Sequence, residues 1–195
     1  MSDVSNLTDL QWAKVARYPS YTVARTWDFW GLNQYGTFLI ESTSTANDDE
    51  GLSGLFGIKF STHETWPNTT LPENNVVPWG LRKHLGWIKE KYGNPEIYVT
   101  ENGYAEPMGA DLRDYDRVKF YRDYINEMLK SVSIDGVNVR MYTAWTLLDA
   151  FEWKLGYTVS FGVVAVNFSD PRRQRTPKLS AFCLKQIYND NGFPK

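Results

Sequence analysis

The stretch Ile97-Tyr98-Val99-Thr100-Glu101-Asn102-Gly103 decides the fold. Its first four residues are apolar, aromatic or β-branched and predict a strand, and the Asn-Gly dipeptide predicts a turn directly after it. Active sites of parallel α/β proteins form at the carboxyl ends of strands, so Glu101 stands where a catalytic carboxylate would stand. Taken alone, the pattern is more typical of an ordinary strand-end glutamate beside a turn.

Two further strand ends carry polar and aromatic residues. The stretch 142–153, YTAWTLLDAFEW, ends in a carboxylate and an indole that could hydrogen-bond sugar hydroxyls, and Trp145 offers a flat stacking face. In the stretch 28–35, DFWGLNQY, alternation along a strand places Asn33 and Tyr35 on the same face. The simpler readings are a Trp-rich core element capped by acids and a strand end with satisfied polar groups.

Helical periodicities separate these strands. Apolar residues recur at helical spacing from Leu81 to Tyr92, between Pro78 and Gly93 as start and stop signals. A second helix is expected to carry an apolar face made of Val118, Tyr121, Ile125, Met128 and Val132. A third helix is expected over 178–188. A strand that runs into a loop is expected over 29–40, and strands are expected at 96–100 and about 139–147. The alternation predicts an α/β fold with a parallel sheet and helices outside it.

Three strands are too few for a closed barrel. An eight-stranded (β/α)₈ barrel takes about 250 residues, and this chain has 195. Three parallel strands would also leave two open edges, which natural proteins avoid exposing. The sequence therefore predicts an incomplete barrel, and it leaves open that the chain does not fold alone.

Composition limits the classes of partner. The chain is 42% hydrophobic and 15% aromatic with a formal net charge of −2, which is typical of a globular domain with its own core. This near-neutral balance argues against a nucleic-acid partner, and no apolar run is long enough to span a membrane. The basic cluster Arg172, Arg173 and Arg175 is interpreted as a solvated loop.

The sequence predicts no metal and no cofactor. His63 and His84 lie far apart and form no zinc motif, and the glycines between 51 and 57 lack the ending of a phosphate loop. The single cysteine, Cys183, is expected to be a buried, inert thiol. The segment from Met1 to Asn6 shows no signal peptide. A secreted, lysosomal or digestive location would require one in a longer chain, so the compartment stays open.

The three strand ends together resemble glycoside hydrolase family 1, the β-glucosidase family. The resemblance is carried by GLNQY (31–35), IYVTENG (97–103), WTLLDAFEWKLGYTVSFG (145–162) and the tail DPRRQRTPKLSAF (170–182). It covers residues 27–195 and leaves 1–26 unassigned. The resemblance implies a (β/α)₈ TIM barrel of which this chain supplies strands 6 to 8 with their helices, the N-terminal half being the missing partner.

The resemblance also implies an activity, retaining hydrolysis of β-glycosides such as glucosides. Two carboxyl groups about 5–5.5 Å apart perform that reaction, one as nucleophile and one as acid and base. The motif assigns the nucleophile to Glu101, with Tyr35 hydrogen-bonded beside it. The substrate-binding residues implied are Asn33 in the same subsite, Trp145 as stacking platform, Glu152 and Trp153 on the sugar hydroxyls, and Phe161 as an apolar wall. The Glu152 carboxylate would repel a sugar 6-phosphate, which favours an unphosphorylated substrate.

Departures from the family pattern qualify this prediction. The acid/base glutamate of the family lies in an Asn-Glu-Pro motif that these 195 residues lack, and Asn94-Pro95-Glu96 is no substitute. Ser160 replaces an arginine that helps fix the charge around the nucleophile. Other replacements are Ala150, Met141, Asn167 and Cys183. The chain alone is therefore expected to be inactive. The alternative is a non-catalytic sugar-binding or receptor-partner module on the same fold.

Overall fold

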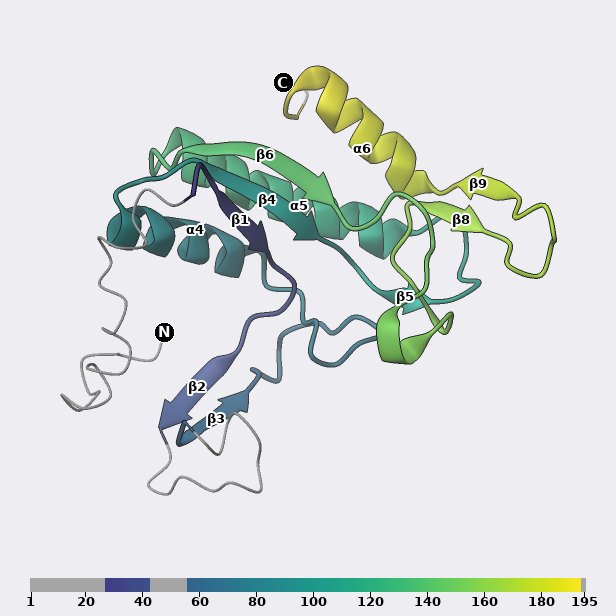
Figure 1. The fold of residues 1–195 in the computed structure, drawn as a ribbon, viewed down its shortest axis with the longest axis horizontal. Coiled ribbons are helices and arrows are strands. Elements are labelled where there is room, and N and C mark those ends of the chain that lie inside the picture. Colours follow the sequence, from purple (N-terminus) through teal and green to yellow (C-terminus); the bar gives the residue numbers. More distant parts are fainter. Residues whose placement is uncertain (1–26, 43–55, 194–195) are drawn as a thin grey trace. The chain divides into compact units, whose positions relative to one another are not determined.

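The computed structural model describes residues 27–42 and 56–193, which fall into two compact units. The smaller unit contains β2 (Leu39–Ser42) and β3 (Ile58–Ser61), an antiparallel pair (Figure 1). The Phe38 and Phe60 rings meet edge to face there, with centroids 5.8 Å apart. The larger unit comprises 29–36 and 67–193 and contains every predicted site residue.

A three-stranded parallel sheet is the centre of the larger unit. β1 (Trp30–Asn33), β4 (Ile97–Asn102) and β6 (Val139–Ala144) lie in the order β1-β4-β6 (Figure 1). This confirms the parallel α/β prediction; within the described ranges the sheet is not closed into a barrel. The strand expected to run into a loop over 29–40 ends at Asn33, and in the loop after it the Gln34 side-chain amide donates to the Gly36 carbonyl at 2.8 Å.

Three helices connect and follow these strands. They are α4 (Pro78–Tyr92), α5 (Tyr115–Ser133) and α6 (Leu179–Asp190). As predicted, Pro78 begins α4 and Gly93 ends it in the left-handed conformation, φ 74°. Two residues of the predicted apolar faces are instead exposed: Tyr92, whose ring packs on Trp30, and Val132, which lies in the last turn of α5.

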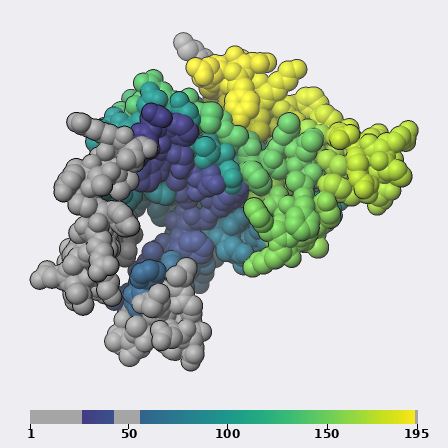
Figure 2. All heavy atoms as spheres, in the orientation of Figure 1, coloured from purple at the N-terminus to yellow at the C-terminus, as the bar shows by residue number. Residues whose placement is uncertain are grey.

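Outside the three-stranded sheet, after β4 and again between β6 and α6, the chain forms small elements that the sequence did not predict. They are the 3₁₀ turn η3 (Trp153–Leu155) and the strands β5 (Glu106–Pro107), β7 (Val159–Ser160), β8 (Val164–Val166) and β9 (Arg175–Pro177). β5 pairs with β7, and β8 with β9. The space-filling view shows α6 and the β8–β9 hairpin beside the green segment that follows β6 (Figure 2).

Buried side chains form two clusters. The main core lies between the sheet and the helices and includes Val99, Leu85 and Tyr121. A small second cluster consists of Ala105, Val159 and Phe161, with Tyr35 and Trp145 packed against it. This second cluster lies under the predicted site, so the same residues pack the loops and shape the site.

Three smaller expectations can be compared directly with the structure. The loop between β8 and β9 is solvated as predicted, with the Arg172 side chain 88% exposed. Cys183 is only partly buried, which corrects the expectation of a buried thiol; this partial burial raises the pKa of the thiol. Among the described residues, no helix is both long and apolar enough to cross a lipid bilayer.

Candidate functional site

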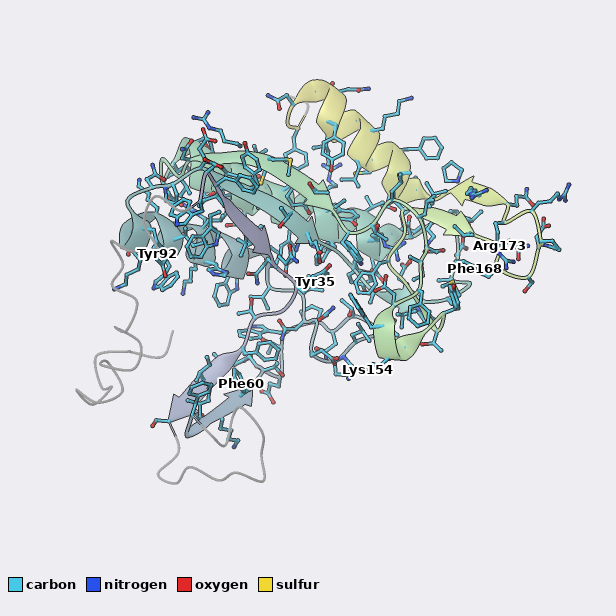
Figure 3. All side chains as sticks on the ribbon, viewed as in Figure 1. Tyr35, Phe60, Tyr92, Lys154, Phe168 and Arg173 are labelled. Carbon is cyan, nitrogen blue, oxygen red and sulfur yellow. The ribbon has the colours of Figure 1, made fainter. Side chains whose placement is uncertain are left out.

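A cavity of about 410 Å³ lies at the carboxyl ends of the sheet strands. All seven residues predicted from the sequence line it. The full lining is Asn33, Tyr35, Leu71, Asn74, Glu101, Trp145, Glu152, Trp153, Lys154, Leu155 and Phe161. Figure 3 shows Tyr35 just beyond the end of β1 and Lys154 on the segment that carries η3. The fold thus brings together residues from three separate stretches of sequence.

Strand register places Glu101 beside the end of β1. Asn33 is the register partner of Glu101, and the next backbone N–H, that of Gln34, donates to the Glu101 carbonyl at 2.9 Å. Two residues beyond the register pair, the Tyr35 hydroxyl donates to Oε2 of Glu101 at 2.6 Å. The Asn33 side chain instead accepts from the Thr100 hydroxyl at 2.7 Å. Of the residues that the structure describes, Tyr35 is the one whose side chain hydrogen-bonds to the Glu101 carboxylate.

Asn102 is a structural part of the site that the sequence reading did not single out. Its side chain is buried, donates to the Gln34 carbonyl at 2.7 Å and accepts from the Tyr142 hydroxyl at 2.7 Å. Gln34 follows β1 and Tyr142 belongs to β6, so one amide joins all three strands beside Glu101. A buried amide is stable only when its donors and acceptors are used, as they are here.

The turn after Asn102 holds Trp145 close to the strand end. A Cβ on Gly103 would lie 2.0 Å from the Trp145 carbonyl oxygen, so only glycine fits. The Trp145 backbone N–H donates to the Asn102 carbonyl at 2.8 Å, and its carbonyl accepts from the Tyr121 hydroxyl at 3.1 Å. These contacts fix the backbone from which the indole enters the cavity.

Glu152 is the second carboxylate of the cavity. It is 6% exposed, and the Trp145 indole N–H lies 3.4 Å from its Oε1. Burial raises the pKa of Glu152, the contact with Trp145 opposes that shift, and the negative charge of Glu101 adds to it. The neighbouring Trp153 is 81% exposed and lies at the rim.

The same two carboxylates, Glu101 and Glu152, also affect the pKa of Tyr35. Its pKa is raised, first by burial, then by the hydrogen bond to Glu101 and the charges of Glu101 and Glu152. Its ring meets Phe161 edge to face, with centroids 6.0 Å apart. A neutral phenol that donates to a carboxylate, aromatic walls and a second carboxylate are suited to holding a polyhydroxylated ring and developing positive charge on it.

Four lining residues were missed from the sequence. Lys154 and Leu155 directly follow the predicted Trp153, so the quoted string contained them. Leu71 and Asn74 lie in the segment before α4, which has no periodic pattern to reveal them. Lining residues from an irregular segment such as this one can be recognised only from the folded structure.

Two residues singled out by the family comparison lie away from the carboxylate. Glu96 precedes β4, at the opposite end of the strand from Glu101, and its carboxylate lies 3.6 Å from the Arg140 guanidinium. The Ser160 hydroxyl contacts Asp149 and Lys178, and its side chain is not among the cavity walls. Across the described residues, no group of three potential metal ligands gathers.

Comparison with known proteins identifies the family of the chain. The sequence model of glycosyl hydrolase family 1 matches residues 12–193. The chain belongs to glycosyl hydrolase family 1. The match begins well before residue 27, where the resemblance in the quoted motifs begins.

Individual relatives of the family agree. The chain is 36% identical to human lactase/phlorizin hydrolase and to human cytosolic β-glucosidase, in each case over 98% of its length. It spans 10% of the first and 42% of the second. The solved structure of β-glucosidase 2 from Trichoderma reesei aligns at a TM-score of 0.79 and 33% identity, covering 96% of this chain and 40% of that one.

Family 1 proteins are (β/α)₈ barrels, and the relatives of the chain named in the previous paragraph are glycosidases. The chain therefore belongs by family to the glycoside hydrolases.

Proposed function

We propose that this chain carries the nucleophile side of a retaining β-glycosidase site, with Glu101 as the nucleophile. The observation that carries the proposal is the 2.6 Å hydrogen bond from Tyr35 to Glu101 inside the cavity that also holds Glu152. In the complete protein, strands 6 to 8 of the barrel would be β1, β4 and β6. The remaining strands would come from the other part of the barrel.

The substrate side is assigned from the cavity walls. Asn33 and Glu152 provide oxygens that accept from sugar hydroxyls, and the exposed Trp153 indole donates from the rim. Trp145 and Phe161 supply flat apolar surface for the ring faces. Two carboxylates in one cavity disfavour a phosphorylated sugar, because like charges repel in a partly dehydrated site. We therefore assign an unphosphorylated β-glucoside.

In this proposal Glu101 performs the first half of the reaction. Glu101 attacks the anomeric carbon, the bond to the leaving oxygen breaks, and a glycosyl–Glu101 ester forms. Protonation of the leaving oxygen requires a second acid, which the family places in an Asn-Glu-Pro motif that these 195 residues lack. The chain alone is then expected to bind glucosides without turning them over.

A mechanism-based label tests Glu101 without that acid. In 2-deoxy-2-fluoro-β-glucosyl fluoride the leaving group is fluoride, which departs without a proton, so a nucleophile alone suffices. The intact chain should gain the mass of one fluoroglucosyl group, located on Glu101 by peptide mapping. Glu101→Gln should stay unlabelled, and the matched variant Glu96→Gln should label like the parent. Label on another residue, or none on a folded chain, would reject the assignment.

The second candidate is a non-catalytic sugar-binding or receptor-partner module. The missing Asn-Glu-Pro motif is the observation that favours it. Calorimetry with a glucose-configured iminosugar, alongside the labelling, separates the two. Binding without labelling supports the module, whereas binding with labelling supports the glycosidase half-site.

A further inference from the structure

The tripeptide Ser160-Phe161-Gly162 is held on its carbonyl side by one buried cation. Arg117 is fully buried on α5, and its guanidinium donates to the Ser160 carbonyl at 2.9 Å and to the Gly162 carbonyl at 3.1 Å. The two bonds flank Phe161. Asp114 and Glu106 lie 2.7 and 2.8 Å from the guanidinium and balance its charge.

The buried carboxylate of Asp149 holds the same tripeptide by accepting hydrogen bonds from it. Oδ1 of Asp149 accepts from the Ser160 hydroxyl at 2.6 Å and from the Gly162 backbone N–H at 3.0 Å. Lys178 lies 3.3 Å from Asp149 and donates to the Ser160 hydroxyl at 2.5 Å. A Cβ on Gly162 would come within 2.6 Å of Oδ1 of Asp149, so Asp149 can pack this closely against the backbone only because residue 162 is glycine.

Phe161 is the residue that this clamp presents to the cavity. It is 4% exposed, lines the cavity and meets the Tyr35 ring edge to face. Tyr35 in turn donates to Glu101. A shift of the tripeptide would move the surface against which Tyr35 packs, and with it the hydroxyl that contacts the carboxylate.

We propose that Arg117 and Asp149 are positioning residues that act through Phe161 on the contact between Tyr35 and Glu101. Buried ion pairs contribute little net stability compared with apolar packing, but their fixed geometry can specify one arrangement. Arg117 suits this role because its planar fork reaches two carbonyls at once, which a lysine does not. The inference rests on the proposed function for its catalytic meaning.

The test follows Tyr35 in the whole chain by NMR of ζ-¹³C-labelled tyrosine at neutral pH, with Tyr35→Phe to assign its signal. In Arg117→Lys the Tyr35 resonance should move toward that of the exposed Tyr115. In Ser160→Ala, which removes one hydroxyl, it should move the same way by less. The matched control is Arg82→Lys, which breaks a two-bond pair between α4 and Asp135, just past the C-terminal end of α5, and should leave Tyr35 unmoved.

Binding of a glucose-configured iminosugar gives the second readout. Arg117→Lys should weaken it roughly tenfold, because small misplacements of a site group are costly. An unmoved Tyr35 signal in a cooperatively melting Arg117→Lys chain would overturn the inference. If that variant does not melt cooperatively, Ser160→Ala decides by the same criterion. The Tyr35 signal needs no ligand, so failed fluoroglucosyl labelling with a shifted signal would count against the proposed function and not against the clamp.

Discussion

Tyr35 and Glu101 are 66 residues apart in sequence and joined by a 2.6 Å hydrogen bond. The bond exists because β1 and β4 are parallel neighbours whose carboxyl ends coincide. The phenol is the donor, so the Glu101 carboxylate is held ready with one oxygen engaged and the other oxygen making no hydrogen bond within the described residues. This pairing makes the ionisation of Tyr35 a measure of the charge on its neighbour.

The variant Glu101→Gln should lower the pKa of Tyr35. Burial is the largest cause of the raised pKa and stays in place, but the hydrogen bond to a carboxylate and its negative charge are removed. The ζ-carbon shift of Tyr35 is followed up to the highest pH at which the chain stays folded, and Tyr35 should begin to ionise at a lower pH in the variant than in the parent. Glu96→Gln serves as control. An unchanged Tyr35 titration would mean that burial alone sets the pKa.

Glu152→Gln should stabilise the chain at pH 7 and weaken ligand binding. The folded pKa of Glu152 is raised by burial, so its favourable contribution exists below the unfolded pKa and is lost as pH rises through the folded value. Removing the charge should raise the free energy of unfolding at pH 7, and the melting temperature with it. The gain should vanish near pH 4, where glutamate is mostly protonated.

Melting curves at both pH values and calorimetry with the iminosugar check this pair of effects. Glu73→Gln, an exposed glutamate in the segment before α4, is the control and should change neither. A variant that binds as well as the parent would remove Glu152 from the substrate contacts.

Gly103→Ala and Gly86→Ala should have opposite effects on stability. The added methyl at Gly103 meets the Trp145 carbonyl at 2.0 Å, whereas at Gly86 it meets nothing within 4 Å. We expect a loss of about 3 kcal/mol for Gly103→Ala from overpacking. Gly86→Ala lies within α4 and should gain about 1 kcal/mol from helix propensity. Urea unfolding gives both values, and a neutral Gly103→Ala would contradict the described turn.

Stability should fall above about pH 10, where tyrosines of the unfolded chain ionise. Burial raises the pKa of Tyr124 to about 12, and also raises the pKa of Tyr121 and Tyr142. The folded chain then keeps protons that the unfolded chain has lost, so unfolding becomes easier as pH rises. Each such tyrosine contributes up to about 1.4 kcal/mol per pH unit.

Urea unfolding at pH 9, 10 and 11 measures this slope. Tyr124→Phe should make it shallower between pH 10 and 11, and Tyr115→Phe, an exposed position on the same helix, should not. A slope that is the same in Tyr124→Phe and in the parent would show that Tyr124 ionises equally in both states.

Strand ends and helix limits could be predicted because their signals are local. Pro78 and Gly93 bound α4 through properties of single residues. The end of β4 was predicted to within two residues: the strand was expected to end at Thr100 but continues to Asn102, which still pairs with Ala144 of β6. The seven predicted lining residues could be named because each lies within a family motif, most of them near a strand end and two, Glu152 and Trp153, at the start of η3. Their gathering in one cavity then followed from parallel pairing.

The buried charges could not be predicted in the same way. Arg117 falls on a helix face that the pattern assigned to apolar residues, and its partners Asp114 and Glu106 gather only after the loops fold. Charged residues in a sequence are read as exposed, because isolated buried charges are unstable. Only the assembled network, in which each charge is paired, makes burial of Arg117 possible.

The cross-link made by Asn102 separates two demands on neighbouring residues. Asn102 joins three strands, so any descendant of this chain that needs the sheet must keep it, whether or not it cleaves a sugar. The Glu101 side chain, by contrast, makes a single hydrogen bond within the described residues, to Tyr35. If the chemistry were abandoned, substitutions should accumulate first at Glu101 and Tyr35 while Asn102 persists. Adjacent residues of one strand would then record different histories, one of folding and one of catalysis.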